Sequence, residues 1–189
     1  MRTTAPGQSV LLLLDIIDNL NKRQIPYAII GAFAASFYGM VRASLDADAV
    51  ISVHSSQDAV NLCLDLRNKG LIVEHRRGDH NDPIAAVINI EDDFHNRVDL
   101  LIGIRGMAKE VFQRSQGAQF MGASIKIISQ EDFIASKIFA GSPKDIEDVI
   151  GVLNVSGKKT DLVLLKKLTA LYGPDCTKKL QALLKEHSS

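Results

Sequence analysis

Apolar and polar residues alternate most regularly over residues 45–53 of this chain. The apolar residues take every second position, at Leu45, Ala47, Ala49, Ile51 and Val53. A period of two is typical of a β-strand with one buried face. The two acids inside the segment, Asp46 and Asp48, therefore point to the opposite face, about 6.6 Å apart along the chain. Two like charges at that spacing repel each other unless a cation lies between them or one of them takes up a proton.

A second alternating segment, residues 97–102, carries a third outward-facing acid. Here Val98, Leu100 and Ile102 alternate against Asp99, which again predicts a strand with a buried face. Three carboxylates on two strands are the ligand set that a divalent-metal site for phosphate chemistry requires. We therefore predict that Asp46, Asp48 and Asp99 are the catalytic metal ligands, and that the ion is Mg²⁺ or Mn²⁺.

The other patterns in the first two thirds of the chain predict further helices and strands around these two. Helices are expected over 9–22, 32–38, 60–66 and 107–114, and strands over 27–30, 71–73, 84–90 and 123–128. Residues 75–83 are almost all polar and predict a loop. This part of the chain therefore predicts a mixed sheet with helices packed on it.

From Ser129 onward the pattern predicts only helices. Ser129 with Asp132, and Ser142 with Asp145, have the spacing of a capping box, in which two side chains satisfy the first backbone groups of a helix. Two more helices are expected near 160–171 and 175–186, and their leucine stripes predict packing against the rest of the protein. A self-association surface on these helices is the weaker alternative.

Length and composition fit such a division. The chain has 189 residues, of which 46% are hydrophobic, enough for one domain with a core and a helical appendage. We predict an α/β (α+β) fold with a mixed-sheet core over 1–128 and a helical C-terminal part over 129–189 packed on that core. The formal net charge of zero argues against a large nonspecific nucleic-acid surface.

Cysteine use and hydropathy bear on the compartment. Cys63 and Cys176 lie far apart in apolar helical patterns, which predicts buried free thiols. The apolar run at 10–14 is too short to span a bilayer, and no signal-type cleavage site accompanies it. These features predict a cytoplasmic protein without a membrane partner, and they leave its oligomeric state open.

The order of the motifs resembles that of a known superfamily. Gly31-Ala32, followed after thirteen residues by Asp46-Ala47-Asp48-Ala49, resembles the glycine-turn and paired-acid signature of the polymerase β-like nucleotidyltransferases. The string from Gly31 to Asp48 is similar to the small bacterial branch that includes abortive-infection type toxins. The resemblance continues at 97–101, 133–138 and 144–149, and it covers roughly residues 25–154.

The resemblance implies an activity and a set of phosphate contacts. It implies Mg²⁺-dependent transfer of a nucleoside monophosphate from a nucleoside triphosphate to a hydroxyl of RNA, protein or a small molecule. A role in a toxin–antitoxin pair or in phage defence, with a cognate antitoxin as partner, is part of the same implication. The residues that it assigns to nucleotide and phosphates are Gly31, Ala32, Arg42 and Lys137, with Ser36, Asp145 and Asp148 as secondary candidates.

One departure from the family pattern keeps a second function open. Ala32 stands where a second glycine or a serine is usual, which removes a hydroxyl donor and some torsional freedom. The alternative is therefore a non-catalytic module that binds a nucleotide or a partner on a degenerate nucleotidyltransferase fold.

Several site residues also have a plain structural explanation. Asp46 and Asp48 would then lie on a solvated strand face, and Asp99 would pair with Arg97 or Arg105. Arg42 matches a phosphate and a carboxylate such as Asp46 equally well.

The remaining candidate site residues also have a structural explanation. In that explanation Gly31 only allows a tight turn that packing requires. Lys137 falls on the inward side of its helix, where it needs an anion or a route for its ammonium group to reach solvent. Asp145 already has a local role as a cap, and residues 76–80 are a solvated loop unless they contact substrate.

Overall fold

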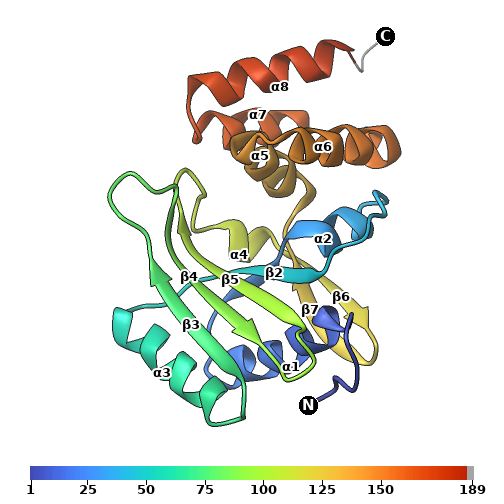
Figure 1. Ribbon diagram of the computed structural model, residues 1–189. Helices are drawn as coiled ribbons and strands as arrows, with labels where there is room; N and C mark the ends of the chain where they lie inside the picture. Colours follow the sequence, from blue (N-terminus) through green and yellow to red (C-terminus); the bar gives the residue numbers. More distant parts are fainter. Residues whose placement is uncertain (187–189) are drawn as a thin grey trace. The chain divides into compact units, whose positions relative to one another are not determined.

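The computed structural model describes residues 1–186, which form two compact units (Figure 1). The first unit comprises residues 1–33, 43–105 and 117–127. The second comprises 34–42, 106–116 and the chain from 128 onward. The division into domains at residue 128 stays a prediction, because these units are groups of mutual contacts and each draws on several separate segments.

A seven-stranded mixed sheet forms most of the first unit. Its strands follow one another in the order β3-β4-β5-β2-β1-β7-β6. Their bounds are β1 (Tyr27–Ile29), β2 (Asp46–Ile51), β3 (Ile72–Arg77), β4 (Ile84–Glu91), β5 (Arg97–Ile104), β6 (Gln116–Phe120) and β7 (Ala123–Ile127). The central strands β2 and β5 run parallel, whereas β5 and β4, β4 and β3, and β2 and β1 pair antiparallel.

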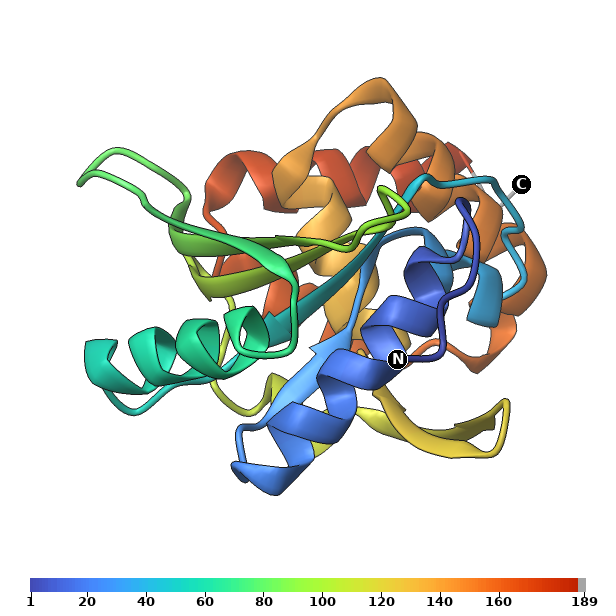
Figure 2. The same cartoon turned by 60° about the horizontal axis from the view of Figure 1, so that its bottom comes forward.

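One face of this sheet is apolar and covered by two helices. The register aligns Ala47, Val98, Ile90 and Val73 across four neighbouring strands, and all four side chains are buried. Helix α1 (Ser9–Lys22) packs on β2 and β5, and α3 (Ser56–Arg67) packs on β3 (Figure 2). Because strand side chains alternate, the residues between these buried positions all point to the opposite, polar face.

The second unit is helical. Its main elements are α4 (Val111–Arg114), α5 (Gln130–Ala140), α6 (Pro143–Ser156), the short 3₁₀ helix η1 (Gly157–Lys159), α7 (Leu162–Ala170) and α8 (Pro174–Glu186). Helix α5 packs against α6, α7 and α8, and its Phe133, Ile134 and Ile138 are fully buried. The Ser142 hydroxyl and the Asp145 carboxylate form a reciprocal capping box that begins α6, which confirms that part of the sequence prediction.

Helix α2 (Gly31–Phe37) follows β1 directly and continues from the first unit into the second. Within the second unit, the Tyr38 hydroxyl donates a 2.6 Å hydrogen bond to the Ile128 carbonyl. Tyr38 is buried, and its burial together with the nearby charges of Glu131 and Asp132 raises the pKa of its phenol. The phenol therefore stays protonated, as this hydrogen bond requires.

The predicted fold class is confirmed, but several segments differ from the sequence prediction. The helix expected over 107–114 covers only Val111–Arg114, and the helix expected over 60–66 runs over Ser56–Arg67. Strand β3 runs to Arg77, so residues 75–77 are not part of the predicted loop. Strand β6 was not expected, because in Gln116–Phe120 only Ala118 and Phe120 alternate with polar residues, and two positions are too few to indicate a strand. Its turn into β7 uses Met121 and Gly122, both with positive φ (49° and 78°), the conformation of a tight hairpin turn without the usual Asn-Gly signal.

Two smaller predictions can also be checked. Cys63 and Cys176 are free and buried, as their apolar surroundings predicted. No helix within residues 1–186 has the length and apolar character needed to cross a membrane.

Candidate active site

The polar face of β2 and β5 brings three acids together. In the parallel register Asp48 lies beside Asp99, and Asp46 lies two residues earlier on the same face of β2. One carboxylate oxygen from each residue lies within 4.8 Å of the others. Asp46 is exposed, and the other two are half-buried. We call Asp46, Asp48 and Asp99 the acidic triad; they are the three acids that the sequence singles out.

The two outer members of the triad receive hydrogen bonds from neutral groups. The Ser44 hydroxyl donates to Asp46 Oδ1 at 2.5 Å, and the Asn89 amide donates to Asp99 Oδ1 at 2.6 Å. Within residues 1–186, neither Asp46 nor Asp99 forms an ion pair with a lysine or an arginine. Since neutral donors do not cancel charge, the negative charges of Asp46 and Asp99 are not offset by these hydrogen bonds.

The alternative prediction, that Asp99 pairs with Arg97 or Arg105, is wrong, because both arginines have other partners. Arg97 pairs with Glu91, with Nε 3.2 Å from Oε2. Arg105 donates instead to the backbone carbonyls of His80 and Asp82, at 3.0 and 2.9 Å. Neither arginine neutralises Asp99.

The donor set suits a hard divalent cation. Mg²⁺ and Mn²⁺ prefer carboxylate oxygens, and a cation between like charges offsets their repulsion. When bound here, such an ion would neutralise phosphate charge and lower the pKa of an attacking hydroxyl. The acidic triad thus fits the predicted metal, whose identity remains a prediction.

The backbone at Gly31 lies directly against Asp48. Its φ is +64°, and a Cβ at this position would lie 2.1 Å from Asp48 Oδ2. The neighbouring Ile30 amide donates to the Asp48 carbonyl at 3.0 Å. Only glycine combines this left-handed conformation with so close an approach. A packing reason for Gly31 therefore exists, while phosphate contact at Gly31 and at the buried Ala32 stays a prediction.

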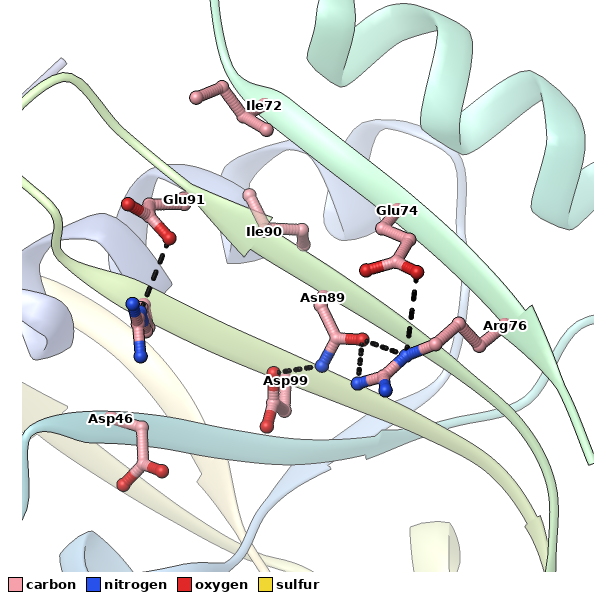
Figure 3. Close-up of a pocket in the computed structure, with 9 residues that line it drawn as sticks. Asp46, Ile72, Glu74, Arg76, Asn89, Ile90, Glu91 and Asp99 are labelled. Carbon is pink, nitrogen blue, oxygen red and sulfur yellow. Dashed lines mark hydrogen bonds and ion pairs between the residues drawn. The ribbon is translucent and has the colours of Figure 1, made fainter.

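A pocket of about 410 Å³ opens on the same polar face (Figure 3). Its walls come from β2, β3, β4 and β5. Its polar lining residues are Asp46, Glu74, Arg76, Asn89, Glu91, Arg97 and Asp99. The pocket thus places two members of the acidic triad beside a polar cavity of the size that small molecules occupy.

Sequence reasoning did not single out Asn89, and it placed Arg76 in a loop that could contact substrate. Asn89 alternates with Ile88 and Ile90 just as Asp99 alternates with its neighbours, so the same pattern could have identified it. Arg76 was assigned to a loop because residues 75–83 are polar. It lies on β3, with its guanidinium against Asn89 (Figure 3).

The other predicted phosphate ligands form a separate cluster in the second unit. Arg42 Nε lies 2.9 Å from Asp148 Oδ1, and Lys137 Nζ lies 2.9 Å from Asp148 Oδ2 and 2.7 Å from Asp145 Oδ1. Asp148 is 0% exposed. We call these four residues the ion cluster. The sequence predicted that Lys137, on the inward side of its helix, would need an anion nearby. Asp145 and Asp148 provide that negative charge.

The electrostatics of the ion cluster are those of a satisfied network. Burial opposes ionisation of Asp145, but hydrogen bonds from Lys137 and Ser142 outweigh it and lower the pKa of this carboxyl. The Arg42 Nη1 atom is the exception, because it is buried and has no hydrogen-bond partner among residues 1–186. Phosphate binding by Arg42 and Lys137, and any site role for Asp145, Asp148 or the half-buried Ser36, stay predictions.

Comparison with known proteins yields similarity in structure only. No model of a known protein family matches the chain, and no curated protein sequence matches it. Among solved structures, the crystal structure of ANT(2″)-Ia in complex with adenylyl-2″-tobramycin aligns with a TM-score of 0.61 and 17% identity, covering 88% of this chain and 99% of that one.

Two further solved structures agree with this result. An antigenic nucleotidyltransferase-like protein from Paracoccidioides brasiliensis aligns with a TM-score of 0.50 and 18% identity, over 97% of this chain and 95% of that one. The lincomycin-bound lincosamide antibiotic adenylyltransferase LnuA aligns with a TM-score of 0.50 and 9% identity, over 82% and 100%. The chain therefore has the nucleotidyltransferase fold, and its acidic triad lies on the polar face of the central strands of that fold.

Proposed function

We propose that this protein is a divalent-metal-dependent nucleotidyltransferase that transfers a nucleoside monophosphate from a nucleoside triphosphate to an acceptor hydroxyl. The single observation that carries the proposal is the acidic triad, in which one carboxylate oxygen from each residue lies within 4.8 Å of the other two. The nucleotidyltransferase fold supports the same conclusion, although fold alone does not establish an activity.

Each member of the triad has a role in this proposal. Asp46 and Asp48 hold the ion that neutralises the triphosphate, and Gly31 lets the backbone approach beside Asp48. Asp99 would complete the ligand set of the metal, and it orients the acceptor hydroxyl and takes its proton. The hydroxyl oxygen then forms a bond to the α-phosphorus while the bond to pyrophosphate breaks, so the protein needs no covalent nucleophile.

The pocket favours a small acceptor over RNA or protein. Its volume of about 410 Å³ lies in the range of small-molecule sites, about 300–1,000 Å³. Among the structurally similar proteins, ANT(2″)-Ia is bound to adenylyl-2″-tobramycin, and the lincosamide antibiotic adenylyltransferase LnuA is bound to lincomycin. We therefore place hydroxyl-bearing small molecules first among the acceptors to test.

The direct test is transfer of labelled nucleotide from ATP, CTP, GTP or UTP, with Mg²⁺ or Mn²⁺, to a panel of small hydroxyl compounds, RNA and protein. The panel includes an aminoglycoside and a lincosamide. Asp46→Asn and Asp99→Asn should each abolish transfer, whereas Asp79→Asn, in the loop after β3, should not. Transfer that survives both triad changes would disprove the metal mechanism.

A second candidate is a nucleotide- or partner-binding module without turnover. It is favoured by Ala32, which is 6% exposed and places a buried methyl group where the resembled signature has glycine or serine. Calorimetry that shows nucleotide binding without product would support this candidate. An antitoxin partner remains a prediction, and co-expression followed by size-exclusion chromatography would test it.

A further inference from the structure

The neighbours of Asp99 on the polar face form a chain of directed hydrogen bonds. Strand β4 lies between β3 and β5, and the register aligns Asn89 with Asp99 on one side and with Glu74 on the other. The Asn89 Nδ2 group donates to Asp99 Oδ1 at 2.6 Å (Figure 3). A cross-strand pair therefore fixes one oxygen of a triad carboxylate.

Arg76 determines which way the Asn89 amide faces. Its Nε and Nη2 groups both donate to Asn89 Oδ1, at 2.8 and 2.6 Å. A guanidinium only donates hydrogen bonds, a carboxamide oxygen only accepts them, and a carboxamide nitrogen only donates them. The reversed amide would turn its NH₂ group against the arginine and its oxygen against the carboxylate, which would break all three bonds.

The neutrality of Asn89 is as important as its direction. A cation in its place would form an ion pair with Asp99 and compete with a metal for the same charge. In the adjacent row of the sheet Arg97 lies beside Asp46 in the β2–β5 register, but its Nε group donates to Glu91 at 3.2 Å. The polar face thus presents a neutral donor to Asp99 and directs Arg97 to a carboxylate outside the triad.

We propose that Asn89, oriented by Arg76, is a positioning residue for Asp99. It occupies Oδ1, so that Oδ2 is the oxygen presented to the metal and to the acceptor hydroxyl. This inference rests on the function proposed above, and it adds two residues from β3 and β4 to the machinery around the acidic triad. Groups that orient metal ligands in this way affect metal affinity or activity by about 10- to 100-fold when they are changed.

The experiment compares the wild-type protein with Asn89→Leu, Arg76→Ala and the control Arg77→Ala. Leucine has a similar size to asparagine but no donor. Arg77 is the next residue of β3 and is equally exposed, but strand alternation points its side chain away from Asn89. Two quantities are measured for each: kcat and nucleotide KM in the transfer assay, and the affinity of the metal-free protein for Mn²⁺ by titration calorimetry.

We expect Asn89→Leu to lower kcat by about 10- to 100-fold, with little change in nucleotide KM, and to weaken Mn²⁺ binding by about tenfold. Arg76→Ala should change both quantities in the same direction but less, because its side chain is 63% exposed. Arg77→Ala should change neither. Thermal unfolding verifies that each variant is folded, and Arg76→Ala keeps the test informative if Asn89→Leu does not fold.

The outcomes separate this inference from the proposed function. A wild-type protein that binds Mn²⁺ without transferring any nucleotide would refute the proposed function, and the Mn²⁺ affinities would then decide on Asn89. Equal kcat and equal Mn²⁺ affinity in folded Asn89→Leu, Arg76→Ala and wild-type protein would overturn the positioning role. A wild-type protein that binds no Mn²⁺ would overturn both.

Discussion

The acidic triad and the ion cluster are made of the same residue type in opposite surroundings. In the ion cluster each carboxylate meets a lysine or an arginine at hydrogen-bond distance, and the central Asp148 is fully buried. In the triad the carboxylate oxygens lie within 4.8 Å of one another, and Asp46 and Asp99 receive their hydrogen bonds from a hydroxyl and an amide.

The difference shows how to distinguish structural from functional acids. A carboxylate that the chain neutralises itself contributes to folding, and removing it leaves buried cations behind. Neighbouring carboxylates such as Asp46 and Asp99, whose hydrogen bonds come from neutral groups, repel each other, and an external cation would relieve that repulsion. Mutations in the ion cluster should therefore lower the stability of the protein, whereas mutations in the triad should lower its activity.

The largest expected effect is on catalysis by the triad. Asp46→Asn removes a metal ligand, and metal stabilisation of phosphoryl transfer amounts to several kcal/mol. Because about 1.4 kcal/mol corresponds to a factor of ten in rate, transfer should fall by at least about 10³-fold. The melting temperature should stay the same or rise, since one like charge has gone. Steady-state kinetics and thermal unfolding of the same preparation check both parts.

The ion cluster should give the reverse result. Asp148→Asn leaves Arg42 and Lys137 without their shared carboxylate, and breaking a buried pair in this way costs about 3–5 kcal/mol. Asp175→Asn is the matched control, because Asp175 pairs with Lys178 at 3.6 Å on an exposed helix surface and should cost at most about 1 kcal/mol. Urea denaturation measures the free energy of unfolding, and equal values for both variants would contradict the assignment.

Gly31 tests the close approach of backbone and carboxylate. Gly31→Ala places a methyl group against Asp48 Oδ2 and keeps an alanine at φ +64°, whereas Gly70→Ala has φ +85° but no atom within 4 Å of its new Cβ. The left-handed conformation costs each variant about 1–2 kcal/mol. Gly31→Ala should be destabilised further and should lose transfer activity. Similar stability and activity in the two variants would show that the contact with Asp48 does not matter.

The smallest effect is a pH dependence from Asp145. Its pKa in the folded protein is lowered below the ordinary value of 3.8, so the unfolded chain binds this proton more readily. Its contribution to stability is therefore present above about pH 4 and is lost as the pH falls through the folded-state pKa. Asp145→Asn should flatten that part of the acid unfolding curve. An unchanged curve between wild type and variant would contradict the role of the Lys137 and Ser142 contacts.

Much of the sheet could be predicted from the sequence because one of its faces is apolar. The alternation of apolar residues around Asp46, Asp48 and Asp99 predicted both strands and the face that carries the acids. The capping box of Ser142 and Asp145 predicted where α6 begins. Strand β6 could not be found in this way, because only Ala118 and Phe120 alternate within Gln116–Phe120 and the turn that follows has Met-Gly in place of Asn-Gly.

The partners of the charged residues were harder to predict than the strands. Which acid meets Arg42, and whether Arg97 reaches Asp99 or Glu91, depends on register and on contacts more than a hundred residues apart in the chain. A single sequence contains no signal for such pairings. Asn89 could have been recognised by its alternation, but its hydrogen bond to Asp99 required the β4–β5 register.

The most direct test of the account is a crystal structure with Mn²⁺ and a nonhydrolysable nucleoside triphosphate, in which anomalous scattering locates the metal. The account predicts an Mn²⁺ peak coordinated by carboxylate oxygens of Asp46 and Asp48, with Asp99 on the same side and the triphosphate beside Gly31. A nucleotide bound elsewhere, or a metal that avoids all three carboxylates, would contradict it.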